Sequence, residues 1–302
     1  MDNRFKGIVI SGPTGVGKTD MSIILAKKLE ADIISADASQ IYKEMTIGTA
    51  KITYDKMKGV KHHLLDIVEP GEDYSVGNFE SDVSKILKEK NGRNIILTGG
   101  TGLYIKSVTD GFSDLPSKDE KIREDLEEKD TRELQKILRD LDENSYKEID
   151  LSNRSRLIRA IEVCLLTGKK FSELKRENIK KNNYRFLKVF LTRNREELYE
   201  RIDKRVDTMF LQGLEEEAKN IYEKYRNRLA KISSIGYKEL FSYFDGNCTL
   251  EESKKDIKRE SRRYAKRQLT WFRKEKDYIT YNLSELSEEK VIKEILKKWE
   301  KF

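Results

Sequence analysis

The sequence is poor in the residues that staple secreted domains or hold structural metals. Only 2 of its 302 residues are cysteines, and Cys164 and Cys248 are too far apart for a C-x-x-C motif, which argues against a zinc ribbon or a disulfide framework. The two histidines, His62 and His63, are adjacent and have no third ligand at metal spacing. We therefore expect both histidines to pack or to form hydrogen bonds.

Long apolar runs are also missing. The hydrophobic fraction is 37% and the mean hydropathy is −0.74, and Asp2-Asn3-Arg4 leads directly into a strand pattern. From this pattern we expect neither a signal peptide nor a membrane span. We expect a cytoplasmic protein without membrane contact, and we expect it to be a monomer.

Charge is abundant, at 38% of all residues, with 61 Lys and Arg against 54 Asp and Glu. The net charge of +7 favours a polyanionic partner. Many lysines stand beside glutamates, as on solvated helix faces, so the excess alone does not decide the question. The position of the basic residues has to do so.

A phosphate-binding loop follows the first apolar run, Gly7 to Ile10, and precedes a helical pattern. It has the form G-x-x-x-x-G-K-T and comprises Gly12, Pro13, Thr14, Gly15, Val16, Gly17, Lys18 and Thr19. In such a loop the backbone N–H groups converge on one anion, the lysine adds a positive charge and the threonine hydroxyl is placed to bind Mg²⁺. The following helix directs its positive dipole end to the same anion.

Alternating strand and helix patterns over the first hundred residues predict a parallel sheet flanked by helices, with ligand groups at the carboxyl ends of the strands. We expect strands at 7–10, 32–36, 94–97, 185–191 and 278–281. Helices without strands fill residues 118–183, which we interpret as an inserted helical subdomain. The α/β core domain then comprises residues 1–117 and 184–302.

Several helix boundaries can be read from local signals. Asp130 and Glu133 form a capping-box pattern for a helix over 131–141, and Gly168 should end a helix over 154–167 whose apolar stripe is Leu157, Ile161, Cys164 and Leu165. Later helices are expected at 195–211, 214–225, 237–244 and 250–276, followed by a C-terminal helix.

The strand at 94–97 does not end in the aspartate that nucleotide hydrolases and kinases use to hold Mg²⁺ through water. It runs instead into Thr98-Gly99-Gly100-Thr101, and the acidic residue, Asp37, comes from a neighbouring strand end. Phosphate binding is therefore predicted, but ATP hydrolysis does not follow. The loop would serve equally for the diphosphate of another donor.

The chain resembles the tRNA dimethylallyltransferases over nearly its whole length. The resemblance lies in the phosphate-binding loop and in segments 34–42, 47–51, 62–66, 99–104, 156–163, 234–237 and 265–271. It departs from the family pattern at Ala38, Ile52 and Lys61, where the family usually has Ser, Pro and Pro. These departures leave Lys18, Thr19, Asp37 and Thr101 untouched.

The resemblance implies a P-loop NTPase-like fold and transfer of the prenyl group of dimethylallyl diphosphate to N6 of the tRNA adenosine on the 3′ side of the anticodon. The amine must lose a proton as it attacks, so a carboxylate is required. Asp37 is the candidate base, with Thr101 as its hydrogen-bonding partner on the adenine, and Mg²⁺ on Thr19 would stabilise the leaving diphosphate. Alternatively, Asp37 is only the N-cap of a helix.

Two arginines at i, i+4, Arg201 and Arg205, could both point to the diphosphate, since an arginine of this segment grips it in the family. They could equally form solvated ion pairs with Glu197 or Asp203. Which of the two arginines contacts the diphosphate stays open.

The tRNA surface is expected to combine strand ends, the insert and a basic helix. Arginines dense among aromatic residues suit an unstacked RNA loop, and the target base must be flipped outward. An exposed basic face without a partner is the alternative. Candidate contacts, most of them carried over from family segments, are Asp37, Ala38, Ser39, Gln40, Thr101, Arg123, Ser155, Arg156, Leu157, Ile158, Arg159, Ser233, Ser234, Ile235, Gly236, Tyr237, Lys238, Arg262 and Arg263.

Three other functions compete with tRNA prenylation. An adenylate prenyltransferase would act on free nucleotide, but it needs neither the helical insert nor the arginine-rich helix. A P-loop small-molecule kinase would bind ATP and would not depend on RNA. A non-catalytic RNA-binding module would not need Asp37.

Overall fold

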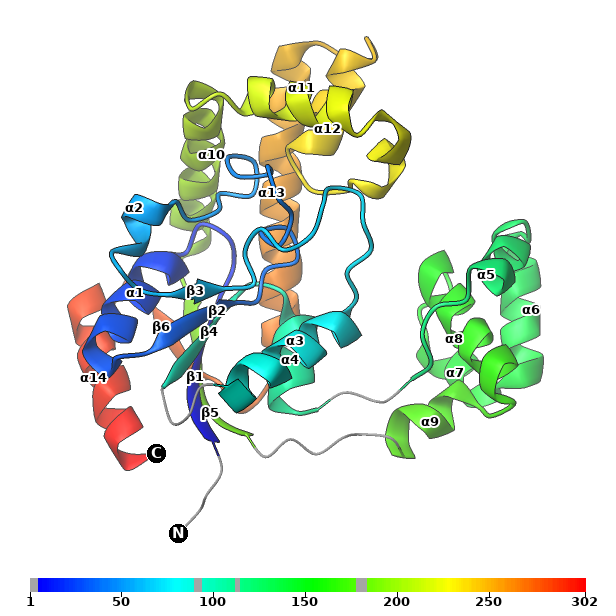
Figure 1. Cartoon of the computed structure of the whole chain (residues 1–302), viewed down its shortest axis with the longest axis horizontal. Helices are drawn as coiled ribbons and strands as arrows, with labels where there is room; N and C mark the ends of the chain where they lie inside the picture. Colours follow the sequence, from blue (N-terminus) through cyan, green and yellow to red (C-terminus); the bar gives the residue numbers. More distant parts are fainter. Residues whose placement is uncertain (1–4, 90–93, 112–114, 178–183) are drawn as a thin grey trace. The chain divides into compact units, whose positions relative to one another are not determined.

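The computed structural model describes residues 5–89, 94–111, 115–177 and 184–302. Contacts divide the chain into two compact units, one formed by residues 1–109 and 183–302 and the other by residues 110–182. Figure 1 shows the helices and strands of both units along the chain.

The larger unit is built on a six-stranded parallel sheet in the order β3-β2-β4-β1-β5-β6. The expected parallel α/β class is confirmed. The strands are β1 (Phe5–Ser11), β2 (Asp32–Ser35), β3 (His62–His63), β4 (Ile95–Gly99), β5 (Tyr184–Thr192) and β6 (Ile279–Asn282). Sequence patterns missed β3 because two residues cannot display an alternating pattern.

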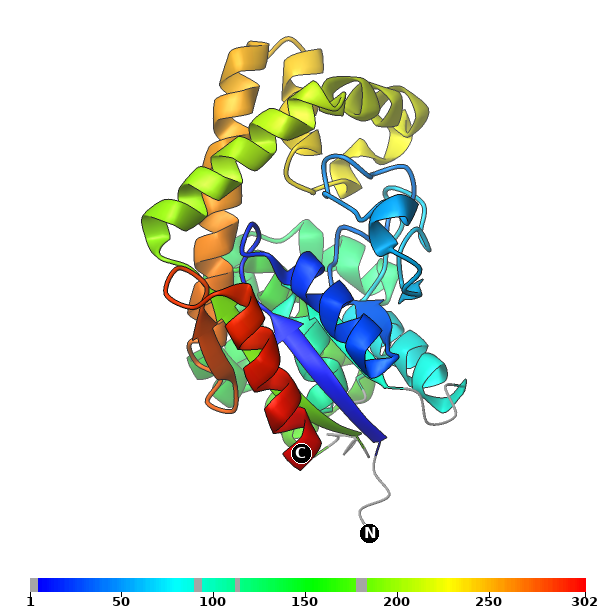
Figure 2. The ribbon, with the colours of Figure 1, turned by 90° about the vertical axis from the view of Figure 1, so that its left-hand side faces the viewer.

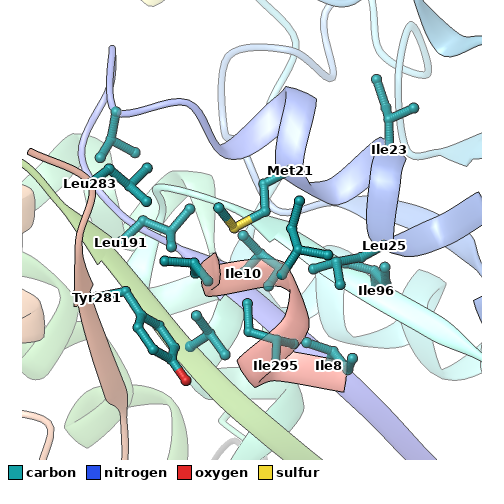
Figure 3. Packing of buried hydrophobic residues seen from close by; sticks show 14 of the residues in the cluster. Ile8, Ile10, Met21, Ile23, Leu25, Ile96, Leu191, Tyr281, Leu283 and Ile295 are labelled. Atoms are coloured by element: carbon teal, nitrogen blue, oxygen red, sulfur yellow. The ribbon is translucent and has the colours of Figure 1, made fainter. Parts of the chain in front are cut away.

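Successive side chains of the strands point alternately to the two faces of the sheet and pack in two apolar layers, one on each face. Ile8 and Ile10 of β1 pack with helices α1 (Lys18–Leu29) and α14 (Glu288–Lys301), and Figure 3 shows this layer closing over Ile96, Leu191 and Tyr281. Val9, between the two isoleucines, points to the other face, where α3 (Val76–Glu89) and α4 (Gly102–Thr109) pack. The central strands are thus buried on both faces, as parallel sheets require.

A third apolar cluster joins four helices beyond the carboxyl ends of the strands (Figures 1 and 2). These helices are α10 (Arg195–Leu211), α11 (Leu214–Lys224), α12 (Tyr237–Phe244) and α13 (Leu250–Phe272). The predicted apolar stripe of α10, Leu198, Ile202, Val206 and Met209, is buried as expected. α13 ends at Phe272, before the predicted end at 276. Short helical turns complete this unit, α2 (Tyr54–Met57) and η1 (Arg226–Lys231).

The smaller unit is entirely helical in its described residues. It contains α5 (Glu120–Glu127), α6 (Thr131–Leu141), α7 (Glu143–Glu148), α8 (Arg154–Thr167) and α9 (Phe171–Glu177) around a leucine- and isoleucine-rich core. The capping box of Asp130 and Glu133 forms, and Gly168 ends α8 with φ of 65°. The stripe predicted for α8 is wrong at Leu165, which is 50% exposed, because Ile158 and Ala160 face the core instead.

Within the described ranges, no helix combines enough length with enough apolar character to cross a membrane. His62 and His63 form hydrogen bonds as expected, His62 with the Val60 carbonyl and His63 with Asp32, which is buried.

Candidate active site

The P-loop joins the end of β1 to the first turn of α1. Gly12 has φ of 153°, and a Cβ there would lie 2.5 Å from the Leu191 carbonyl oxygen of the neighbouring strand, so the loop can make this turn only with glycine. Lys18 reaches back under the loop and donates to the carbonyls of Gly12 and Pro13 at 2.8 and 2.9 Å. Burial lowers the pKa of Lys18 to about 8, against the raising effect of Asp37, and Arg205 lowers it further.

One cavity of about 910 Å³ brings most of the larger unit's predicted site residues together at the carboxyl ends of the strands. Its walls come from the P-loop, the segment after β2, α10, the segment before α12, and α13. The predicted residues that line it are Thr14, Gly15, Gly17, Lys18, Thr19, Asp37, Ala38, Ser39, Gln40, Arg201, Arg205, Ser233, Ser234, Ile235, Gly236 and Lys238. The remaining loop residues, Gly12, Pro13 and Val16, are buried, and Val16 belongs to the apolar layer between the sheet and α1 and α14.

Asp37 follows β2 and its carboxylate accepts the Ser39 N–H at 2.9 Å. No helix begins here, since residues 38–41 form a turn, so the helix-cap interpretation is wrong. The Asp37 charge acts on Lys18, Arg205, Tyr104 and Tyr264. Asp37 is therefore a negative group within a largely basic and phenolic wall.

Thr101 does not line the cavity but supports it from behind. Its hydroxyl oxygen accepts the Ala38 N–H at 3.1 Å, and its backbone N–H donates to the Ala36 carbonyl. The hydroxyl also hydrogen-bonds the phenol of Tyr264, whose pKa burial raises to about 12. Thr101 thus ties the turn that carries Asp37 to helix α13.

The two candidate arginines of α10 take different environments. Arg201 is exposed, and its Nε donates to the Gly15 carbonyl at 2.8 Å, which ties α10 to the P-loop. Arg205 is half-buried in the cavity wall and has neither a hydrogen bond nor an ion pair with another described residue. Burial lowers the pKa of Arg205, against the raising effect of Asp37. The alternative, an ion pair with Glu197 or Asp203, forms for neither arginine.

Of the predicted tRNA residues of the smaller unit, Arg123 and Arg159 are both bound to one buried carboxylate, that of Glu162. Glu162 is fully buried and accepts hydrogen bonds from Arg123 at 2.7 and 3.0 Å and from Arg159 at 2.7 Å. Burial alone would raise the pKa of Glu162, but these bonds and the Asp119 N–H hold it at about 2. On the same helix, Ser155 and Arg156 are exposed, whereas Leu157 and Ile158 belong to the core.

Three further predicted contacts of the larger unit are also engaged by protein groups. Arg262 pairs with Asp203 of α10, and Arg263 pairs at 2.6 Å with Glu260 of its own helix. Tyr237 is fully buried, and its hydroxyl donates to Glu217 at 2.5 Å. Glu217 in turn accepts three backbone N–H groups, those of Thr46, Ile47 and Gly48, and so fixes a loop at the cavity.

Sequence patterns missed several residues that build the site. Tyr74 and Tyr104 line the cavity as an aromatic wall, and Gln268 of α13 hydrogen-bonds the P-loop. Arg193, at the end of β5, donates to the Val16 carbonyl and pairs with Glu197. Two signals were available: the Gly99-Gly100 pair, since paired glycines indicate that another group approaches the backbone closely, and the presence of Tyr104 and Gln268 in segments 99–104 and 265–271, which carry the family resemblance.

Known proteins resemble this chain over nearly its full length. A family model described as IPP transferase matches residues 40–275. The chain belongs to the IPP transferase family. The tRNA dimethylallyltransferase of Fusobacterium nucleatum is 53% identical over 96% of each chain, and that of Anoxybacillus flavithermus is 47% identical over 89% of this chain and 87% of that protein.

Solved structures of IPP transferase relatives share the fold. The full-length tRNA isopentenylpyrophosphate transferase of Bacillus halodurans aligns with a TM-score of 0.72 at 40% identity, over 96% of this chain and 94% of that chain. A eukaryotic dimethylallyltransferase acting on tRNA aligns with a TM-score of 0.80 at 28% identity, over 94% and 75%. The P-loop NTPase-like architecture expected from the sequence is thereby confirmed.

Proposed function

We propose that this IPP transferase family member moves the dimethylallyl group from dimethylallyl diphosphate to N6 of the adenosine on the 3′ side of the anticodon in tRNA. The observation that carries the proposal is one cavity in which a P-loop, an arginine unpaired among the described residues and the strand-end carboxylate of Asp37 meet. The 53% identical tRNA dimethylallyltransferase supports it.

The donor's diphosphate binds at the P-loop, Lys18 and Arg205. During transfer the allylic carbon–oxygen bond breaks and its electron pair leaves with the diphosphate, while the N6 lone pair forms the new carbon–nitrogen bond. Charge therefore grows on the diphosphate oxygens, where fixed cations and backbone N–H groups stabilise it most. Arg205 is the arginine of α10 that we assign to the diphosphate, because Arg201 already donates to the Gly15 carbonyl.

Asp37 takes the proton that N6 loses. It lies in the same cavity as the phosphate-binding groups, and its second oxygen is not needed for the bond to Ser39. Thr101 holds the Ala38 N–H beside this carboxylate, so its first role is to position the base. A hydrogen bond from Thr101 to the adenine would replace the one that it shares with Tyr264.

Thr19 fits a magnesium ion. Its side chain is exposed in the cavity, and its hydroxyl oxygen has no hydrogen-bond partner among the described residues. A hydroxyl is a hard oxygen ligand, and Mg²⁺ typically takes only one or two protein ligands beside water and substrate phosphates. When bound, the ion would neutralise charge on the leaving diphosphate. Lys18 and Arg205 would add fixed positive charge to the same diphosphate.

The RNA loop enters the same cavity. Ser233, Ser234 and Ile235 line it, and so do three exposed cations without an ion-pair partner among the described residues, Lys204, Lys231 and Arg267. The Arg267 guanidinium lies over the ring of Tyr264 at 5.6 Å, an arrangement that suits stacking with an unpaired base. We assign the phosphates of the anticodon loop to these three cations and the flipped adenosine to the segment from Asp37 to Gln40.

The decisive experiment incubates the protein with Mg²⁺, labelled dimethylallyl diphosphate and tRNA, and follows the label into RNA. We expect transfer to full-length tRNA and none to AMP, which tests the adenylate prenyltransferase alternative. ATP in place of the donor should give no phosphoryl transfer. Turnover of the ATP γ-phosphate, unaffected by dimethylallyl diphosphate, would instead assign the chain to the small-molecule kinases.

A further inference from the structure

Gln268 bridges the P-loop, which we assign to the donor, and the Gly100–Thr101 turn, which supports the proposed base. It lies on α13 and is only 5% exposed. Its side-chain oxygen accepts the Thr14 N–H at 2.9 Å, and its side-chain nitrogen donates to the Gly100 carbonyl at 3.0 Å. A backbone N–H can only donate and a carbonyl can only accept, so only a side chain with both functions can make this bridge.

One end of the bridge is the diphosphate cradle. Thr14 stands in the middle of the P-loop and lines the cavity, and its N–H is taken by Gln268 rather than left for a ligand. With that N–H held by Gln268, the loop's register relative to α13 is fixed. Arg201 and Arg193 hold the same loop through the carbonyls of Gly15 and Val16.

The other end is the turn that supports the proposed base. Gly100 lies next to Thr101, which holds the Ala38 N–H beside Asp37. A Cβ at residue 100 would collide with the side-chain nitrogen of Gln268, so glycine at this position is what lets the amide approach. Gln268 therefore spans the distance between the groups that bind the donor and the groups that bind the acceptor.

We propose that Gln268 is a positioning residue that holds the P-loop and the Gly100–Thr101 turn at a fixed separation, so that the donor carbon and the adenosine amine meet in line. The inference rests on the proposed function. Without the amide, each substrate still finds its own contacts, but the two reacting atoms are no longer held at reacting distance. Misplacement by about 1 Å costs on the order of 10²-fold in rate.

The test compares Gln268→Met with the parental protein and with Thr270→Ala. Methionine keeps the length and much of the apolar volume but removes both hydrogen bonds, whereas Thr270 is exposed on the same helix and bonds only within it. Three quantities are measured: the single-turnover rate with saturating tRNA and dimethylallyl diphosphate, the affinity for inorganic diphosphate, and the affinity for tRNA. Thermal unfolding shows whether each variant folds.

We expect Gln268→Met to lower the single-turnover rate by roughly 10²-fold and to change both affinities by less than about threefold. Thr270→Ala should match the parent in all three. An unchanged rate, or a rate loss explained by weaker diphosphate binding, would overturn the positioning role. If Gln268→Met does not fold, Gln268→Asn decides in its place, since it keeps the amide but is one methylene too short for both bonds. A parental protein that transfers nothing to tRNA defeats the proposed function itself, which is a separate outcome.

Discussion

Two sets of basic residues differ in what balances their charge, and each set includes residues predicted to bind substrate. Lys18, Lys204, Arg205 and Arg267 line the cavity without a carboxylate at ion-pair distance among the described residues; we call them the cavity cations. Arg123, Arg159, Arg262 and Arg263 each pair with an internal carboxylate; we call them the paired cations. Sequence position alone does not separate the two sets.

We interpret the paired cations as stabilising the fold and the cavity cations as binding a ligand. A paired cation gains its counter-charge within the protein, and a buried pair such as Glu162 with its arginines is strongly destabilised when one partner is removed. A cavity cation can gain a full counter-charge only from a bound anion. Substitutions of the first set should therefore act mainly on stability, and those of the second set on binding and catalysis.

The largest expected effect belongs to the cavity cation Lys18. Lys18→Ala should reduce single-turnover transfer by roughly 10³-fold, since it removes the P-loop cation that we assign to the leaving diphosphate. Lys27→Ala, an exposed lysine of the same helix, is the control and should behave as the parent does. Because the pKa of Lys18 is about 8, the parental affinity for inorganic diphosphate should fall as pH rises through 8. A Lys18→Ala protein that transfers at the parental rate would contradict a role of Lys18 in binding the diphosphate.

The paired cations Arg123 and Arg159 share one partner, Glu162, and are tested together by removing its charge. We expect Glu162→Gln to destabilise the smaller unit by about 3 kcal/mol. The measurements are urea denaturation and amide exchange in α8, with Glu143→Gln as a control, because the exposed Glu143–Lys147 pair should contribute less than about 1 kcal/mol. The lowered pKa of Glu162 means that its contribution is present above the ordinary value near 4.5 and is lost as pH falls toward about 2. Equal stability of Glu162→Gln and Glu143→Gln would show that the buried ion pairs of the paired cations do not stabilise the fold more than an exposed pair does.

Local signals in the sequence predicted the architecture well. The P-loop, the parallel strands and the bounds of α6, α8 and α10 depend on turn glycines, caps and apolar periodicity, which act within a few residues. The pairing of Arg262 with Asp203, fifty-nine positions away, and the bridge from Gln268 to Thr14 depend on how helices pack, which no local pattern encodes. Asp37 could be found because strand ends of a parallel sheet share one edge.

Asp37 is the negative group that acts on two of the cavity cations, Lys18 and Arg205. Asp37→Asn should lower single-turnover transfer by about 10²-fold, the usual scale of general base catalysis, and leave tRNA affinity nearly unchanged. Loss of this negative charge should also strengthen binding of inorganic diphosphate, since the cavity cations are then less compensated.

The control for Asp37 is Asp20→Asn, which removes another carboxylate lining the same cavity but lying on the first turn of α1. If Asp37→Asn transfers at close to the parental rate, the proton leaves to another group or to solvent. If Asp20→Asn loses as much rate as Asp37→Asn, the loss reports the cavity's overall charge rather than a base.

The smallest expected effect separates the two sets on neighbouring helices. Lys204→Ala with Arg267→Ala should weaken tRNA binding by roughly tenfold and reduce the salt slope by about 0.7 for each phosphate of the single-stranded loop that is no longer neutralised. Arg262→Ala with Arg263→Ala also removes two positive charges, both from α13, but these arginines already neutralise Asp203 and Glu260. Filter-binding titrations at several salt concentrations should therefore give this second variant the parental slope. A flattened slope would mean that the ion pairs open and that their arginines turn to the RNA backbone, in which case pairing in the free protein does not predict which cations bind tRNA.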